Sequence, residues 1–297
     1  MSTPAMTVES VPVAPATRQR QWLALIRLTL RQWRARIGLG IFAFMVLLAV
    51  AGPLIAPHQP DVFVSAPNAP AGHGLLFGSD SLGRDVWSRF LYGGRSVLGM
   101  SLAATIIGVG LGLVVGLTAA YSGGIVDEIL MRVSDVFMAF PQIVLALLLV
   151  TAFGPSIGLI ILIVGISTAP RVARVIRGAA LQVVERDFVK AAEAVGEPRW
   201  RIIFGELLPN VTSPLLVEVG LRLTYSIGLI AALNFIGDGI QPPTADWGVM
   251  INENRLAVSV QPWGVVLPIL AIALLTIGTN LLTDGFARAA IGIDRGE

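Results

Sequence analysis

Several polar side chains in this chain are spaced so that they could do chemistry together. Glu218 and Arg222 lie four residues apart within a long apolar run, and Asn234 lies deeper in the same run. An i, i+4 spacing lets an acid and a base pair on one helix face, and charged groups in lipid must pair or face a wet interior. We favour a structural ion pair for Glu218 and Arg222 over a substrate contact, and we favour a structural role for Asn234 over a place on a solute pathway.

A second polar group precedes the second long apolar run. It contains Asp80, Arg84 and Asp85. These side chains could contact a partner protein. Alternatively, Asp80 or Ser79 could accept backbone N–H groups at the start of a short interfacial helix that carries Asp85, because such oxygens are common N-terminal caps. We favour the cap.

Metal and hydrolytic chemistry have no support in the residue pattern. His58 and His73 are 15 residues apart in a Pro-rich stretch, and the chain has no Cys. Two His residues do not complete a metal site, so we interpret both as solvated loop residues. Neither a Gly-x-Ser-x-Gly elbow nor a His-Glu-x-x-His pattern occurs. We therefore predict no catalytic residue, metal site or cofactor in this chain.

The composition predicts an all-α polytopic membrane protein. Of the 297 residues, 55% are hydrophobic and 13% are charged, whereas soluble domains carry about 25% charged residues. The apolar runs are long enough to cross a bilayer as helices, which takes roughly 20 residues. A net charge of +2 without a basic face argues against nucleic acid as a partner. We expect six transmembrane helices, over residues 37–56, 97–120, 136–153, 156–171, 213–235 and 263–283.

Residues 18–36 of the N-terminal arm (1–36) alternate Trp and Leu with Arg. Such a pattern is typical of an amphipathic helix on a membrane surface, with Trp at the headgroups and Arg against anionic lipid. Docking of this arm on a partner protein is the alternative. We favour the lipid surface.

Lys and Arg residues are distributed unevenly between the two sides of the expected helices. With the N-terminus inside, the inner segments (1–36, the turn at Arg132, 171–212 and 284–297) hold 16 of them, and the outer segments (57–96 and 236–262) hold four. Inner loops of membrane proteins are enriched in Lys and Arg. We therefore expect both termini and the 171–212 loop in the cytosol, with a five-helix core over 97–283.

The second span carries Gly108, Gly112 and Gly116, which repeat every four residues. This spacing puts the three on one helix face, where another helix backbone can approach closely. We expect tight helix packing there.

The 171–212 loop is interpreted as two short helices. The first covers 185–195, and Gly196 suits a left-handed cap at its end. Pro198 suits the first turn of the second helix, which runs to Leu208. Apolar residues share one face in each helix and are expected to pack on the bundle or on a partner: Phe188, Ala191, Ala192 and Val195 in the first, and Trp200, Ile203, Phe204 and Leu207 in the second. Four charged residues are expected in solvent: Glu193, Glu197, Arg199 and Arg201.

Residues 190–209, KAAEAVGEPRWRIIFGELLP, resemble the EAA loop of permease subunits of bacterial ABC importers. That pattern has Glu-Ala-Ala, a Gly six residues after the Glu, and a later Leu-Pro. The chain matches it at Ala191, Ala192, Gly196, Leu208 and Pro209. Lys190, the only Lys, stands where the family has Glu, and Glu193 one turn later could replace the missing acid. The resemblance implies ATPase coupling through Lys190, Ala191, Ala192, Glu193, Gly196, Arg199, Trp200 and Pro209.

Two further blocks are similar to the dipeptide/oligopeptide/nickel branch of these importers. One is FGSDSLGRDVWSRFLYGGRSVL at 77–98, and the other is FIGDGIQPPTADWG at 235–248. The three blocks occur in the family's order. The resemblance therefore covers about residues 75–297 and implies the second permease of a pair with a type I importer fold.

This resemblance also implies partners and a location. The chain would sit in the bacterial cytoplasmic membrane with a homologous permease, two ATPase subunits that hold ATP and Mg, and an extracytoplasmic binding protein. The sole Lys190 is flanked by Val189 and Ala191, so this chain has no Walker A motif of its own. Candidates for contact with the binding protein are Asp80, Arg84, Asp85, Pro242, Pro243 and Trp247.

The expected solute is a short peptide, with nickel chelates, glutathione, sugars or another small solute as alternatives within the same branch. An ion-coupled secondary transporter is the competing class. It often carries acids near mid-bilayer and inverted repeats, and neither is evident here. A membrane-embedded enzyme or scaffold would need a catalytic constellation, which the sequence lacks.

Overall fold

The computed structural model describes residues 27–72 and 74–294. Residues 18–26 of the expected surface arm, and His73, lie outside the described residues. Residues 27–31 are helical, and Gln32 has an extended conformation that separates them from the first long helix.

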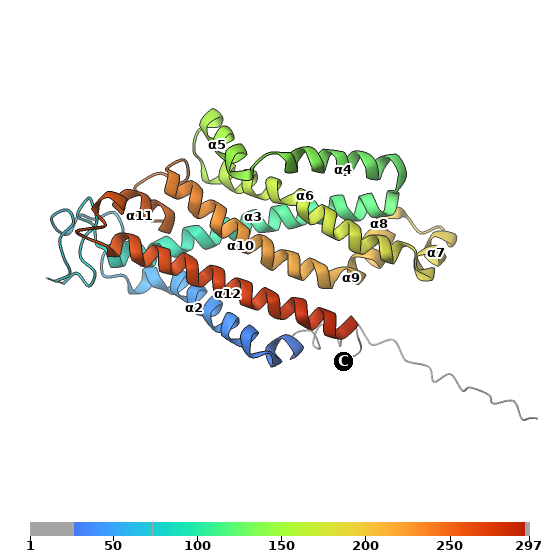
Figure 1. The fold of residues 1–297 in the computed structure, drawn as a ribbon, viewed down its shortest axis with the longest axis horizontal. Helices are drawn as coiled ribbons and strands as arrows, with labels where there is room; N and C mark the ends of the chain where they lie inside the picture. The colour runs from blue at the N-terminus through green and yellow to red at the C-terminus, as the bar shows by residue number, and fades with distance from the viewer. Residues whose placement is uncertain (1–26, 73, 295–297) are drawn as a thin grey trace, which may run out of the picture.

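Five helices in the described ranges are long and apolar enough to cross a membrane. They lie side by side in an elongated bundle (Figure 1). They are α2 (Trp33–Ile55), α3 (Val86–Ser122), α6 (Ile157–Val184), α10 (Thr212–Ile236) and α12 (Trp263–Asp294). The expected all-helical membrane fold is confirmed.

The expected third span, 136–153, is not one straight helix. The chain forms α4 (Gly124–Ala139) and α5 (Gln142–Phe153), which are bent by 82° relative to each other. Pro141 causes the break, because a proline pushes the preceding residue out of the α-helical region. Phe140 accordingly adopts an extended conformation. A sixth span exists only if this bent pair is counted as one.

Three helices run beyond the expected spans. Helix α3 begins 11 residues before 97, so the expected short interfacial helix is part of α3 itself. Helix α6 continues past 171 to Val184. Helix α12 continues through most of the expected C-terminal tail.

The glycine face of α3 packs against α6, as predicted. A Cβ added at Gly112 would lie 2.6 Å from the Ala169 carbonyl oxygen and 2.5 Å from the Val172 Cβ. Added Cβ atoms at Gly108 and Gly116 would also meet α6 backbone atoms closer than 3.0 Å. These glycines therefore let the two backbones approach closely.

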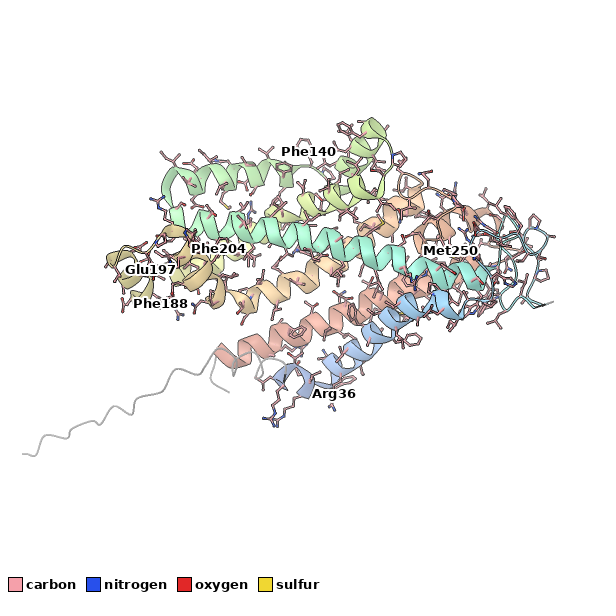
Figure 2. All side chains as sticks on the ribbon, turned by 180° about the vertical axis from the view of Figure 1, so that it is seen from behind. Arg36, Phe140, Phe188, Glu197, Phe204 and Met250 are labelled. Atoms are coloured by element: carbon pink, nitrogen blue, oxygen red, sulfur yellow. The ribbon has the colours of Figure 1, made fainter. Side chains whose placement is uncertain are left out.

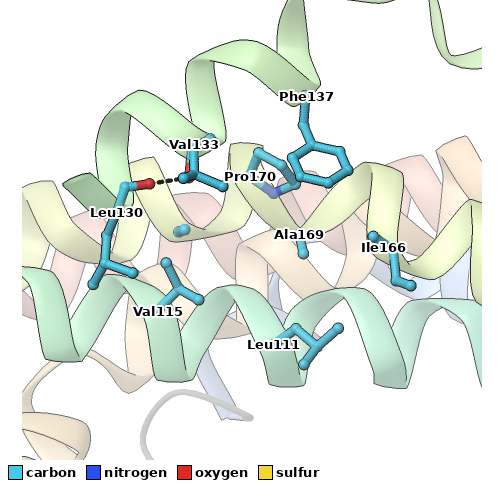
Figure 3. A pocket seen from close by; sticks show the side chains of 10 residues that line it. Leu111, Val115, Leu130, Val133, Phe137, Ile166, Ala169 and Pro170 are labelled. Atoms are coloured by element: carbon cyan, nitrogen blue, oxygen red, sulfur yellow. Dashed lines mark hydrogen bonds between the residues drawn. The ribbon is translucent and has the colours of Figure 1, made fainter.

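Helix α4 leaves an apolar cavity of about 190 Å³ against α3 and α6 (Figure 3). Leu111, Phe137 and Ile166 are among its lining residues. The one hydroxyl in the lining, from Ser134, donates to the Leu130 carbonyl oxygen at 2.8 Å. The lining of the cavity therefore carries no charged group that could pair with a charged solute.

The two ends of the bundle carry different structures (Figure 1). One end holds the loop before α3 together with α11 (Trp247–Asn254). The other end holds α7 (Asp187–Ala194), α8 (Arg199–Arg201) and α9 (Leu208–Asn210), which lie in the connection from α6 to α10. Figure 2 shows the same separation, with Met250 at one end and Phe188, Glu197 and Phe204 at the other.

Candidate functional site

The connection between α6 and α10 begins with a capped helix. Helix α7 (Asp187–Ala194) ends before Gly196, which has a φ of +83°. Glycine adopts this conformation without the strain of a Cβ. The N–H groups of Gly196 and Glu197 donate to the carbonyl oxygens of Glu193 (2.9 Å) and Ala192 (3.1 Å). The predicted left-handed cap at Gly196 is confirmed.

The second half of this connection differs from the expected α-helix. Pro198 lies at the N-cap of α8 (Arg199–Arg201) instead of in its first turn. A π-helix, η1, follows over Ile202–Leu207, and α9 covers Leu208–Asn210. The connection is helical throughout this stretch, but with a wider turn than the apolar spacing indicated. We call residues 187–210 the coupling segment.

The wide turn has a local cause in Pro209. The Leu208 N–H donates to the Ile203 carbonyl oxygen, five residues back, which is a π-type bond. Pro209 has no N–H and cannot donate to the Gly205 carbonyl, so the α-helical ladder is interrupted here. Short π-helical turns occur frequently at functional sites.

Three apolar side chains hold the coupling segment on the bundle. Val189, Ile202 and Leu207 have no exposed surface. They belong to one apolar cluster with Leu117 of α3 and Ile176 of α6. Burial of each side chain stabilises the docked segment by about 1.5–3 kcal/mol. The segment is therefore a firmly attached part of the bundle.

Other apolar side chains of the coupling segment point into solvent. Phe188, Val195, Trp200 and Phe204 are 38%, 84%, 63% and 45% exposed. We call these four residues the apolar tip. The expected second stripe is therefore split, because Leu207 is buried and Ile203 packs against the same cluster, whereas Trp200 and Phe204 are exposed. The Arg201 guanidinium lies 5.6 Å from the Trp200 ring and covers part of it.

The residues that match the EAA pattern lie on this segment. Lys190, Ala191, Glu193 and Arg199 are exposed. Ala192 and Pro209 are half-buried, and Ala192 packs against the apolar cluster. The Lys190 Nζ lies 3.4 Å from a Glu185 carboxylate oxygen. Lys190 therefore pairs with an acid N-terminal to it on the chain, and not with Glu193.

The predicted pair within α10 is formed. The Arg222 Nε donates to a Glu218 carboxylate oxygen at 3.0 Å, and both residues are buried. The Arg222 guanidinium also lies 5.3 Å from the Tyr225 ring. This geometry satisfies both charges internally, and a pathway role for the pair stays a prediction.

The loop before α3 is held by a buried network of charges at the other end of the bundle. Arg84 donates to Asp80 at 2.7 Å and to Glu253 of α11 at 2.8 Å. Arg89 of α3 donates to Glu253 at 2.7 Å and lies 3.4 Å from Asp80. We call these four residues the acid–arginine network. It joins the loop, α3 and α11.

The expected cap by Asp80 or Ser79 is wrong. The N-cap of α3 is Asp85, whose carboxylate accepts from the N–H groups of Trp87 (3.3 Å) and Ser88 (3.1 Å). Asp80 is occupied by the network, and Ser79 holds the backbone of its own loop. His58 is half-buried with Nδ1 3.3 Å from Asp85, so it is a partner of the cap and not a solvated loop residue.

A second buried carboxylate organises the loop after α10. Asp246 accepts from Asn234 at 2.8 Å, from Ser96 at 2.7 Å and from the Gly248 N–H at 2.8 Å. The Asn234 oxygen accepts from the Ile240 N–H at 2.9 Å. Burial raises the pKa of Asp246 above its usual value, against the effect of these hydrogen bonds. Asn234 thus anchors a loop in this structure.

The candidates for contact with a binding protein fall into two groups. Asp80, Arg84, Asp85 and Trp247 are buried, and the Trp247 Nε1 donates to the Phe90 carbonyl oxygen at 2.9 Å. Pro242 and Pro243 are exposed. Of these candidates, only Pro242 and Pro243 are accessible to a partner in this structure.

Together, the bundle, the capped coupling segment and the network at the opposite end define a polytopic membrane protein with distinct structures on its two sides. Residues 108–291 match the family model described as "Binding-protein-dependent transport system inner membrane component", and residues 21–71 match the N-terminal transmembrane domain of oligopeptide transport permease C. The chain belongs to this family of transport-system inner membrane components, which confirms the resemblance found in the sequence.

Relatives and a solved structure agree with this assignment. The chain is 38% identical over 261 residues to a Brucella suis biovar 1 protein whose name describes a peptide transport system permease, covering 87% of this chain and 88% of that protein. It is 35% identical over 279 residues to the glutathione transport system permease protein GsiD of Escherichia coli O157:H7, with 93% and 92% covered.

The fold is similar to that of the inward-facing MetNI methionine ABC transporter. The TM-score is 0.55 at 18% identity, over 68% of this chain and 96% of that chain. The fold of this chain therefore agrees with the family assignment made from its sequence.

Proposed function

We propose that this chain is one of two permease subunits of an ATP-driven importer, and that its coupling segment is held by an ATPase subunit. The observation that carries this proposal is the apolar tip. Val189, Ile202 and Leu207 anchor the segment, while Phe188, Val195, Trp200 and Phe204 remain exposed. Exposed apolar side chains on an element that is otherwise packed on the bundle are typical of a protein interface.

The attachment of the segment explains how movement would pass into the membrane. Closure of two ATPase subunits on ATP would draw the coupling segments of both permeases together and open the pore to the outside by rigid-body motion. The segment can transmit such a movement because its buried residues pack directly on α3 and α6. ATP binding would shift the equilibrium between the closed pore and the pore open to the outside only if the ATPase contacts the coupling segment differently in these two states.

The orientation follows from the uneven distribution of Lys and Arg. The coupling segment and both termini face the cytosol, and the loops around α11 face outward. The outer loops would receive a binding protein near the exposed Pro242 and Pro243. A second, homologous permease completes the pore, and lipid surrounds the pair. ATP and Mg belong to the ATPase subunits.

The proposed solute is a short peptide delivered by the binding protein. The relatives are named for peptide and glutathione transport, and glutathione is itself a tripeptide. Nickel chelates or another small solute are the alternatives. The binding protein encoded beside this gene should be purified and the ligand it retains identified. Retention of a nickel chelate or a sugar, and no peptide, would overturn the peptide assignment.

The coupling role is tested by placing charge on the apolar tip. The double variant Trp200→Glu, Phe204→Glu should abolish co-purification of the ATPase, because burying two unpaired carboxylates in an interface is costly. Its thermal unfolding should match the wild type, since both side chains are already exposed. The control is Leu256→Glu, at a residue that is 90% exposed and follows α11 at the opposite end.

The control variant should retain the ATPase. Unchanged ATPase association in the double variant would overturn the coupling role. Solute uptake that persists without any ATPase, and depends on a proton gradient alone, would support the secondary-transporter class instead.

A further inference from the structure

An apolar groove of about 560 Å³ runs between α2 and α3. Its walls are rows of residues spaced four apart, with Phe42, Val46 and Val50 on α2 and Leu98 and Leu102 on α3. Gly99 lies between the two rows, and a Cβ added there would meet no atom within 4 Å. The groove is therefore open along the surface of two membrane-spanning helices.

Arg95 lies at one end of this groove. Its Nε donates to the Ala49 carbonyl oxygen at 3.3 Å and its Nη2 donates to the Val50 carbonyl oxygen at 2.6 Å. The Ala49 carbonyl needs this donor, because Pro53 has no N–H to complete the helical bond. A guanidinium has five N–H donors, and Arg95 forms no ion pair within the described part of the chain. Its charge is available to an anion.

A second pocket, of about 470 Å³, adjoins the groove, and Arg95 lines both. Gln59, Asp61, Tyr92 and Thr244 also line this second pocket. Asp61 is exposed and, among residues 27–72 and 74–294, forms no ion pair. Arg95 and Asp61, neither of which forms an ion pair in the described ranges, therefore line the same pocket, and this pocket adjoins the apolar groove.

We propose that groove and pocket together bind one phospholipid with a zwitterionic headgroup, of the phosphatidylethanolamine type. The phosphate lies on Arg95, the ammonium points toward Asp61, and an acyl chain fills the groove. From Arg95 to the exposed Ile106, α3 offers an apolar track of about 17 Å. This length suits most of an acyl chain.

A lipid fits this site better than a soluble peptide, because the groove lies within the membrane-spanning part of the helices. Helix α2 is the least buried of the five candidate spans, with 22% of its most apolar window covered by the rest of the chain. The rest of this window is not covered by the chain and can meet lipid. The inference rests on membrane embedding alone and is independent of the proposed coupling to an ATPase.

Native mass spectrometry of the full chain, co-expressed with its transport partners, tests the headgroup contacts. The detergent-purified complex is titrated with phosphatidylethanolamine or with phosphatidylglycerol. Arg95→Gln should lower retention of both lipids about fivefold, the factor that corresponds to about 1 kcal/mol for one basic residue. Arg95→Lys should retain both lipids. Asp61→Asn should lower retention of phosphatidylethanolamine and spare phosphatidylglycerol.

A plug variant tests the groove itself. Gly99→Leu should displace the lipid without disturbing the fold, because the added side chain enters open space. The matched control is Gly228→Leu, an exposed glycine of α10 that also has open space around it and does not line this groove. It should retain the lipid at the wild-type level.

Three results would overturn the proposal. Equal lipid retention in Gly99→Leu and wild type would show that the groove holds no acyl chain. Displacement of the lipid by a dipeptide would identify the site as a substrate site. Loss of the second permease from Gly99→Leu preparations, with lipid retention unchanged, would identify the groove as a subunit interface.

Discussion

The Glu253 carboxylate accepts a hydrogen bond at 2.7 Å from the Nη2 of Arg89, although the two residues are 164 positions apart. The same oxygen accepts from Arg84 at 2.8 Å. Glu253→Gln would leave two buried arginines without this counter-charge, and we expect a loss of about 3–5 kcal/mol in the free energy of unfolding. Denaturation in detergent, followed by Trp fluorescence, measures this loss.

The control for this prediction is Glu128→Gln. Glu128 lies 3.8 Å from Arg132, and both side chains are mostly exposed. Exposed pairs contribute about 0–1 kcal/mol, so this variant should unfold like the wild type. If Glu253→Gln unfolds with the same free energy as the wild type, the acid–arginine network does not stabilise the fold.

Gly112→Ala should separate α3 from α6. The added Cβ would lie 2.6 Å from the Ala169 carbonyl oxygen, and overpacking of this kind costs about 1–3 kcal/mol. Gly110→Ala is the matched control, because a Cβ at Gly110 meets nothing within 4 Å. Unfolding midpoints of the two variants give the comparison. Equal unfolding midpoints of Gly112→Ala and Gly110→Ala would contradict the role of Gly112 in packing α3 against α6.

Gly196→Ala should loosen the end of α7. Its φ of +83° is strained for any residue with a Cβ, at about 1–2 kcal/mol. We expect faster trypsin cleavage at Lys190 and Arg199, and weaker ATPase association. Gly205→Ala is the control, since Gly205 has an ordinary backbone and its nearest neighbour would be 3.8 Å from the new Cβ. Trypsin cleavage of Gly196→Ala at the wild-type rate would contradict a strained cap.

Glu218→Gln should destabilise the bundle by about 3–5 kcal/mol, because Arg222 would remain buried without its partner. The double variant Glu218→Leu, Arg222→Leu should recover most of that stability, since apolar replacements of a buried pair are often neutral. Uptake assays on the double variant separate the two roles. Recovered stability with lost transport would show that the pair acts on the pathway.

Asp246 should make the stability of the loop between α10 and α11 depend on pH. Burial raises its pKa in the folded protein, so the folded state binds the proton more tightly than the unfolded chain. The stabilising contribution is then full below about pH 3.9, the ordinary pKa of Asp. It is lost as the pH rises through the folded-state pKa.

Asp246→Asn keeps the side-chain shape and removes this titration. Its oxygen can accept from Asn234 and Gly248, and its amide can donate to Ser96. Relative to the wild type, the variant should gain thermal stability as the pH is raised from about 4 to about 8. A constant difference in melting temperature across this range would contradict the raised pKa.

Local features of this protein were predictable from the sequence, because their causes lie within a few residues. The apolar runs predicted the long helices, and Gly196 predicted a left-handed cap. Breaks at proline were harder. Pro141 ends a helix, whereas Pro53 and Pro170 lie inside helices. The outcome depends on whether a neighbour satisfies the freed carbonyl, as Arg95 does for the carbonyl opposite Pro53.

Contacts between distant segments were not predictable from one sequence. Glu253 carries no local pattern, and the local pattern of Asp246 is only that of the N-cap of α11, yet each organises a buried network across about 150 residues of chain. Likewise, periodicity placed Phe204 and Leu207 on one face, but the bundle covers only Leu207. Which part of an amphipathic helix is covered depends on the surface to which it docks.

Helix α3 runs without a proline from Val86 to Ser122, from the acid–arginine network to the apolar cluster beneath the coupling segment. At 37 residues it is about 55 Å long. A tilt of about 5° around its midpoint would carry each tip roughly 2 Å in opposite directions, by the same geometry. One continuous helix thus connects the acid–arginine network with the apolar cluster beneath the coupling segment. A tilt of α3 at one end would therefore move its other end directly.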